Sequence, residues 1–177
     1  AAQFGAANSF FIFSLAPLFA LLWIRLARRG WEPSTPIKFS LGIAQAGLGF
    51  GALVYGAQFP DQAGLVSAWW LILAYLLHTT GELCLSPVGL SAVTKLAVPS
   101  VVGVMMGTWF LASAYSSYVA AQIATIAARP ATEATLDPAG ALAVYTELFG
   151  QLLTIGLAGG AVLIVLSPIL KMLINTW

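Results

Sequence analysis

Apolar residues fill five long stretches of the chain, and short polar segments separate them. The stretches span residues 4–26, 37–57, 67–96, 101–128 and 139–173. Each is long enough to cross the hydrocarbon core of a bilayer, which takes about 20 residues of α-helix. Turn residues mark the breaks, as at residues 32–36, where Thr35 should cap the second helix and Pro36 should start it. The pattern predicts an all-α membrane protein with five transmembrane helices.

Composition excludes a soluble domain. Hydrophobic residues make up 60% of the 177 residues and charged residues only 7%, whereas soluble domains carry about 25% charged residues. The chain therefore needs the lipid bilayer as its partner. Its net charge of +1 gives no reason to expect nucleic acid. The chain begins inside an apolar stretch without a basic flank, so we expect a piece of a longer protein.

The residue types that carry enzyme chemistry are scarce. One cysteine and one histidine rule out a disulfide framework and argue against a metal site. No P-loop, nucleophile elbow or metalloprotease helix is present in the sequence. We therefore expect neither an enzyme nor a bound metal.

Charge placement gives an orientation. Seven basic and six acidic residues make thirteen charges, and all but Glu82 fall near predicted helix ends or in loops. With five helices, six basic residues share one side of the membrane, and Arg129 alone lies on the other: Arg25, Arg28, Arg29, Lys38, Lys95 and Lys171. The positive-inside rule then predicts a cytoplasmic C-terminus.

Pairs of small residues predict close helix packing. Three G-x-x-x-G pairs occur, at residues 47–51, 103–107 and 156–160. Such pairs let helices approach closely, either within one bundle or between two copies of a chain. We interpret them as packing within the bundle.

Glu82 is the charge that does not fit a helix end. It lies 15 residues after Ser67 and 13 before Lys95, so it is about 20 Å from either end of its helix. A charge at this depth costs on the order of 3 kcal/mol or more and persists where it faces a cavity or a partner. The alternative is a structural ion pair or a permanently protonated carboxyl. His78, four residues earlier, is either part of a proton relay with Glu82 or a packed neutral ring.

The fourth predicted helix carries a second group of candidates. Trp109 and Ser113 are one turn apart on one face. Trp109 is expected at a depth comparable with that of Glu82, which is too central for an interfacial aromatic belt. Its ring is therefore either lipid-facing bulk or the apolar wall of a pocket.

Several segments resemble proton-coupled oligopeptide transporters. The third predicted helix contains the run GELCLSPVGLS (residues 81–91), which strongly resembles the tenth helix of that family, and GVMMGTWFL (residues 103–111) resembles the eleventh. Weaker similarity links residues 3–8 and 15–20 to the eighth helix, residues 33–39 to the loop into the ninth, and residues 145–149 and 166–168 to the twelfth. The likeness spans nearly all of the chain, in order.

This resemblance implies a fold and a site. It implies helices eight to twelve of a major facilitator fold, with the substrate site near the bilayer midplane and a partner N-terminal half of six helices. By position, Glu82 and Asn8 match residues that hold the amino end of the peptide. Trp109 matches the tryptophan of the pocket wall, and Ser86 and Ser113 match small pocket-lining residues. The chain departs from the family pattern at Ser9, commonly proline, and at Ser116-Ser117, usually Gly-Asn.

The resemblance also implies a function. We expect proton-driven symport of di- and tripeptides across a bacterial inner membrane, with protons as the coupling ion and no other cofactor. Two rivals are a transporter of nitrate or another small solute, which a central Glu82 would disfavour, and a membrane scaffold or sensor that does not transport. The scaffold would need no carboxylate at mid-membrane.

Overall fold

The protein consists of five α-helices joined by short connections. The structure is a computed structural model, and it describes residues 2–62, 64–133 and 138–175. The helices are α1 (Ala2–Arg28), α2 (Thr35–Gly56), α3 (Ala68–Leu96), α4 (Val102–Glu133) and α5 (Pro138–Asn175). This confirms the predicted all-α class and the five helices.

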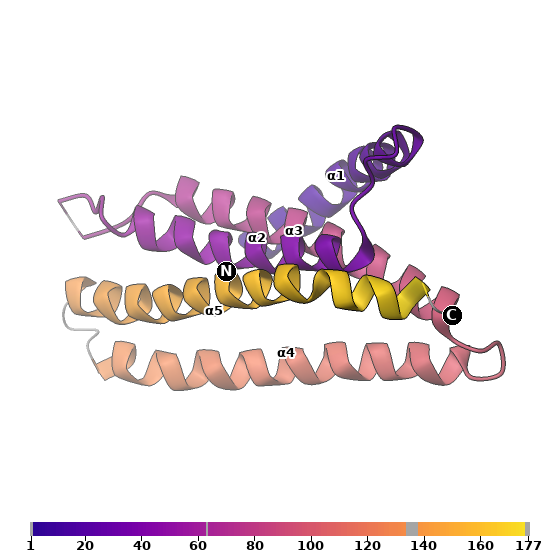
Figure 1. The fold of residues 1–177 in the computed structure, drawn as a ribbon. Coiled ribbons are helices and arrows are strands. Elements are labelled where there is room, and N and C mark those ends of the chain that lie inside the picture. Colours follow the sequence, from indigo (N-terminus) through magenta and orange to yellow (C-terminus); the bar gives the residue numbers. More distant parts are fainter. Residues whose placement is uncertain (1, 63, 134–137, 176–177) are drawn as a thin grey trace.

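Helix α2 lies at the centre of the packing, between α3 and α5 (Figure 1). Glycines bring the three helices together: a Cβ atom on Gly156 would lie 2.6 Å from the Cα of Gly47, and one on Gly81 would lie 2.7 Å from the carbonyl oxygen of Gly42. Ser40, fully buried, donates a hydrogen bond of 2.7 Å to the carbonyl of Gly160. The backbones themselves are therefore in contact, as expected for small residues at membrane helix interfaces.

Helices α1 and α4 lie at the edges of this core. Helix α1 diverges from α2 and contacts α3, whereas α4 runs alongside α5 and also contacts α3 (Figure 1). Within the described residues, the helices long and apolar enough to cross a membrane are α1, α2, α3 and α5. Helix α4 has 32 residues but is more polar, and its exposed hydroxyl residues include Thr108, Ser113, Ser116 and Ser117. These hydroxyls donate to carbonyls of α4 itself, and large apolar side chains such as Leu111 are exposed beside them.

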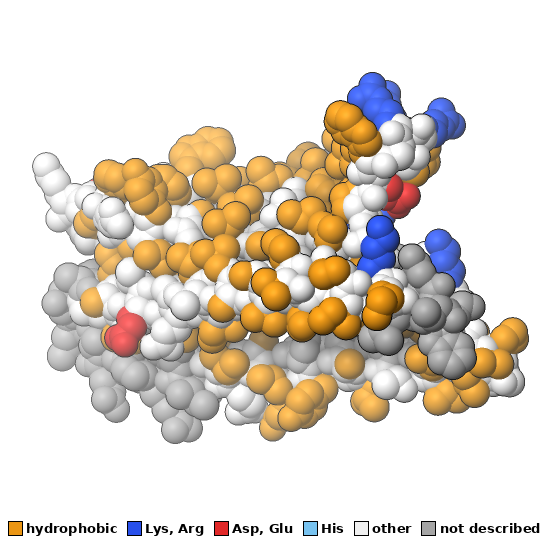
Figure 2. All heavy atoms as spheres, in the orientation of Figure 1, with side chains coloured by type: hydrophobic (Ala, Val, Ile, Leu, Met, Phe, Trp, Pro, Cys, Tyr) orange, Lys and Arg blue, Asp and Glu red, His pale blue; other side chains and the backbone are white. Residues whose placement is uncertain are grey.

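One end of the bundle is basic. Arg25 and Arg28 lie in the last turn of α1, Lys95 lies in the last turn of α3, and Lys171 lies near the end of α5. Figure 2 shows hydrophobic side chains over most of the visible face, and Lys and Arg side chains at the end with the α1–α2 connection and the C-terminal end of α5. The predicted clustering of basic residues therefore holds in three dimensions.

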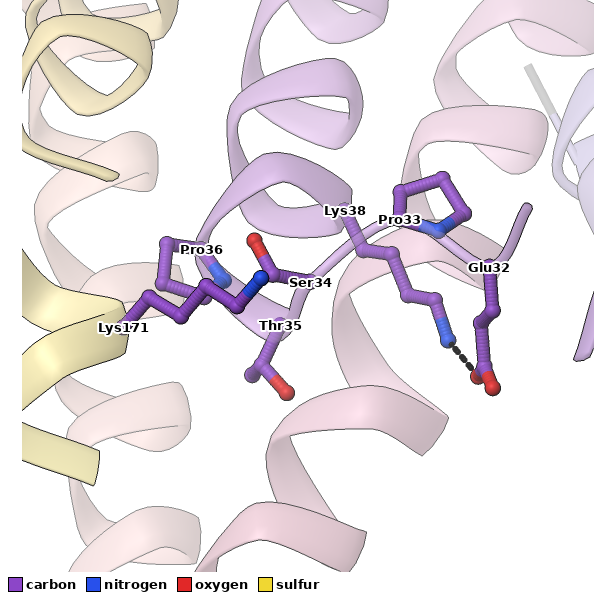
Figure 3. Close-up of a pocket in the computed structure, with 7 residues that line it drawn as sticks. All are labelled: Glu32, Pro33, Ser34, Thr35, Pro36, Lys38 and Lys171. Carbon is purple, nitrogen blue, oxygen red and sulfur yellow. Dashed lines mark hydrogen bonds and ion pairs between the residues drawn. The ribbon is translucent and has the colours of Figure 1, made fainter. Parts of the chain in front are cut away.

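A buried lysine organises this basic end. Lys38, in the first turn of α2, is 7% exposed, forms an ion pair with Glu32, and lies over the ring of Trp23 at 4.6 Å from its centroid. A hollow of about 310 Å³ adjoins the pair, and Lys171 of α5 borders it from the other side (Figure 3). The ion pair ties the α1–α2 connection to the start of α2.

Three details differ from the expectations. Helix α2 begins one residue early, so Ser34 occupies the cap position, Thr35 lies inside the helix, and Pro36 stands in its first turn. Helix α4 continues to Glu133 instead of ending at residue 128, because charged residues are tolerated where a helix leaves the hydrocarbon. Gly103 and Gly107 meet nothing within 4 Å, so this pair does not pack against the described helices.

Candidate substrate site

Glu82 lies at the middle of α3. Fourteen residues separate it from Ala68 at one end and from Leu96 at the other, or about 21 Å each way. Its side chain is exposed, and among the described residues its carboxylate has no hydrogen bond or ion pair. The helix continues unbroken through Pro87, so Glu82 is presented by a rigid element. An unpaired carboxylate at this depth faces an uncovered side of the bundle.

Contacts on α3 show which side that is. Gly81 and Cys84 face α2, since Gly81 meets Gly42 and the thiol of Cys84 lies 3.7 Å from the side-chain oxygen of Gln45. Thr79 faces α1. Glu82 lies three residues beyond Thr79 and points between these directions. Its exposed carboxylate therefore lies between the α1-facing and α2-facing sides of α3.

Asn8 of α1 reaches this side of α3. Its side-chain Oδ1 lies 2.5 Å from Oγ1 of Thr79, 71 residues away in the sequence. Residues three apart on a helix are neighbours on its surface, about 5–6 Å apart at Cβ. Asn8 therefore contacts α3 three residues before Glu82, and a ligand shared by the two side chains stays a prediction of the family resemblance.

Trp109 of α4 packs against the same helix further along. A Cβ atom on Gly89 would lie 2.1 Å from Cη2 of Trp109, so the indole fills the space that a side chain would take. The ring also borders a hollow of about 300 Å³ with Val93, Met105, Thr108 and Ala112. The ring of Trp109 thus packs against α3, and its role as the wall of a peptide pocket stays a prediction.

The depth of the Trp109 ring differs from the expectation. Gly89 lies seven residues beyond Glu82, or about 10 Å along α3, so the two side chains are not level. Gly89 lies seven residues before the end of α3 at Leu96 and Trp109 seven residues after the start of α4 at Val102, so both are about 10 Å from the basic end, whereas Glu82 is about 21 Å from it. Trp109 bounds the site on the side of the basic end.

The two serines take different places. Ser86 lies one turn beyond Glu82 on the same face of α3, between Glu82 and Gly89, and is partly exposed. Ser113 is exposed, and its hydroxyl donates 3.0 Å to the carbonyl of Trp109 in its own helix. Ser86 is therefore in line with the other candidates, and Ser113 lies one turn beyond Trp109.

His78 points elsewhere. Its Nε2 lies 3.0 Å from the carbonyl oxygen of Ala46 and must donate to it, because a carbonyl only accepts. Its ring packs on Phe50 with centroids 4.6 Å apart, and Gly49 provides the space for it. Within the described part of the chain no hydrogen bond joins His78 to Glu82. These contacts favour the packed ring over the relay, since the side chain is held by α2.

Two residues of the candidate site are not among those that the sequence indicated. Thr79 bonds Asn8, and Gly89 receives the ring of Trp109. Spacing could have indicated both, since Thr79 and Gly89 lie three residues before and seven after Glu82, on one face of α3. Nothing in the spacing, however, identifies the helix that meets each position.

Comparison with known proteins places this arrangement in a family. The model of the POT family matches residues 1–146. The uncharacterized transporter YclF of Bacillus subtilis is 40% identical over 168 residues, which cover 95% of this chain and 31% of the relative. Dipeptide and tripeptide permease B of Salmonella typhimurium is 35% identical over 174 residues, which cover 98% of this chain and 35% of the relative. The chain thus spans about a third of the length of these relatives.

Solved structures agree with the sequence match. Tetrameric PepTSo2 superposes with a TM-score of 0.74 at 30% identity, covering 97% of this chain and 33% of that one. A peptide transporter POT crystallised with alafosfalin, as its E310Q mutant, gives a TM-score of 0.64 at 33% identity over 92% of this chain and 30% of that one. Both comparisons confirm the resemblance read from the third and fourth helices. The chain belongs to the POT family of multi-pass membrane transporters.

Proposed function

We propose that the protein is a proton-driven symporter of di- and tripeptides, and that this chain supplies part of the peptide site. One observation carries the proposal: the carboxylate of Glu82, at the centre of α3, is exposed and has no partner among the described residues. In contact with lipid this charge would cost on the order of 3 kcal/mol or more. A peptide has a free ammonium group at one end, which is the cation that such a carboxylate would bind.

The neighbouring groups suit the rest of a peptide. Asn8 offers an amide beside Glu82, and Trp109 offers an apolar surface about two turns along α3. Every peptide has an amino end, so a site that holds this end by charge tolerates varied side chains. Several relatives are named dipeptide and tripeptide permeases, which supports the same substrate class.

The remaining two-thirds of the transporter would complete the site. In the major facilitator fold an N-terminal half of six helices faces the C-terminal half across the substrate. It would cover the open side of α3 beside α1 and would supply a group for the peptide carboxylate. Protonation then biases which side of the membrane the site opens to.

The basic end supports an orientation. Six Lys and Arg residues gather where α1 and α3 end, where α2 begins and where α5 approaches its C-terminal end. We place this end in the cytoplasm of a bacterial inner membrane by the positive-inside rule.

The test is uptake by the full-length protein in liposomes. With an inward proton gradient, we expect accumulation of a labelled dipeptide above its outside concentration, and its collapse on addition of a protonophore. Competing unlabelled tripeptide should suppress uptake, and nitrate should not. Nitrate uptake without peptide uptake would support the anion transporter instead, and no uptake of either would support a scaffold.

A further inference from the structure

We propose that Thr79 is a positioning residue that fixes the orientation of the Asn8 amide and leaves the amide oxygen free for the substrate. This inference rests on the proposed peptide site, and it adds a residue outside the set that the sequence indicated. Thr79 itself touches no substrate, because it is fully buried between α3 and α1. It would act through Asn8.

The hydroxyl of Thr79 has one proton and two neighbouring acceptors. Its Oγ1 lies 2.5 Å from Oδ1 of Asn8 and 2.8 Å from the carbonyl oxygen of Tyr75. A hydroxyl has a single proton and cannot donate to two acceptors at once. If Thr79 donated its proton to Asn8, the oxygen of Thr79 and the carbonyl oxygen of Tyr75 would face each other with no proton between them. One of the two contacts must therefore run in the other direction.

The amide of Asn8 can satisfy this requirement. An asparagine side chain presents an oxygen and an NH2 group at equivalent positions, and a half-turn about its last bond exchanges them. With NH2 toward α3, Asn8 donates to Oγ1 of Thr79, and Thr79 donates to the carbonyl of Tyr75. Bonds of threonine to the carbonyl four residues earlier are common in membrane helices. Every polar atom in the contact then has a partner of the right kind.

This orientation matters for a cation. The amide oxygen of Asn8 is then not used by Thr79, which lies three residues before Glu82 on α3, so the amide oxygen and the Glu82 carboxylate would be two acceptors for the three N–H groups of an ammonium. In the opposite orientation the NH2 group would be free beside Glu82 and would compete with the ammonium for the carboxylate. Thr79 therefore selects for a free amino end without touching it.

The experiment compares Thr79→Val with Thr79→Ser in the full-length protein. Valine keeps the shape and removes the hydroxyl, and serine restores it. We measure competition for dipeptide uptake by a free dipeptide and by its N-acetylated form. Thr79→Val should weaken binding of the free peptide about fivefold, the worth of about 1 kcal/mol, and the acetylated form less than about twofold. Thr79→Ser should stay near wild type. Equal losses for both peptides would overturn the proposal.

A double-mutant cycle supplies the second readout. In an Asn8→Ala background, Thr79→Val should cause no further loss of selectivity for the free peptide, because the group it positions is gone. Thermal unfolding without ligand tests the hydrogen bond separately, and the double variant should lose no more melting temperature than the larger single loss. Additive losses in both readouts would refute the pairing. Thr79→Ala takes the place of valine if the valine variant does not fold.

These readouts separate two failures. If the wild-type protein takes up no peptide, the proposed function fails, while the ligand-free unfolding cycle still reports whether Thr79 and Asn8 are coupled. If the wild-type protein transports peptides and Thr79→Val weakens binding of free and acetylated peptides equally, the proposed function stands and the positioning role is wrong.

Discussion

Replacing Glu82 with glutamine is the sharpest test of the site. Glutamine keeps the size and shape of the side chain and removes its charge. Because Glu82 is exposed and has no partner among the described residues, the change leaves no cation of these residues unpaired. The variant also removes a charge that is costly at mid-membrane. We therefore expect the melting temperature of the purified full-length protein to stay the same or rise slightly.

The effect on binding follows from the lost charge. A hydrogen bond to a charged group contributes about 1.5–3 kcal/mol, and about 1.4 kcal/mol corresponds to a tenfold change in affinity. Glu82→Gln should therefore weaken binding of a free dipeptide about 10- to 100-fold. A peptide with an acetylated amino end has no charge to pair, so its affinity should change little.

The assay is competition for proton-driven dipeptide uptake in liposomes, with free and acetylated peptides measured side by side. Glu147→Gln is the matched control, because it makes the same chemical change at an exposed glutamate on α5, which packs on α2 and α4 and not at the Glu82 face of α3. Equal losses for the two peptides in Glu82→Gln would refute the amino-end assignment. An unchanged uptake rate would remove Glu82 from the mechanism.

Three further predictions concern helix packing, the ion pair of the basic end and the membrane orientation. Gly156→Val should cost about 1–3 kcal/mol of stability by overpacking against α2, and the melting temperature should fall. Gly150→Val on the same helix should not have this effect, since Gly150 meets nothing within 4 Å. Equal losses of stability in the two variants would contradict the packing. Glu32→Gln should cost about 1–3 kcal/mol because it removes the counter-charge of the buried Lys38. Adding Lys38→Met should recover most of that loss, and a still less stable double variant would argue against this reasoning. A reporter fused after Trp177 should be active in the cytoplasm, and activity outside would reverse the proposed orientation.

Much of the fold follows from the apolar pattern. The five apolar stretches form five helices, because backbone N–H and C=O groups inside lipid need hydrogen-bond partners within the chain and an α-helix provides them. Exact ends were harder to predict. The expectation put Thr35 at the cap of α2, one residue late, since serine and threonine are both good caps and the two are adjacent.

Spacing predicts faces of one helix but not the partner of each face. The pair at residues 47–51 and the pair at 156–160 meet each other through Gly47 and Gly156, as expected, whereas Gly103 and Gly107 lie open. For the same reason His78 shares a helix face with Glu82 in the sequence and yet is held by the carbonyl of Ala46. The contacts that decided these cases lie on other helices, at sequence separations that no local pattern records.

The way the site is built bears on how a transporter could move. Helices α2, α3 and α5 pack through glycines and a buried serine, so their backbones are in direct contact and resist displacement. Helices α1 and α4 meet α3 over less extensive surfaces, and they carry Asn8 and Trp109. Regions with fewer packed contacts rearrange at lower cost. Glu82 therefore stands on the rigid part of the bundle, while the groups on either side of it come from the parts that can shift. A ligand that bridges Glu82 and Asn8 would hold α1 against α3, which is how binding at this position could favour one arrangement of the helices over another.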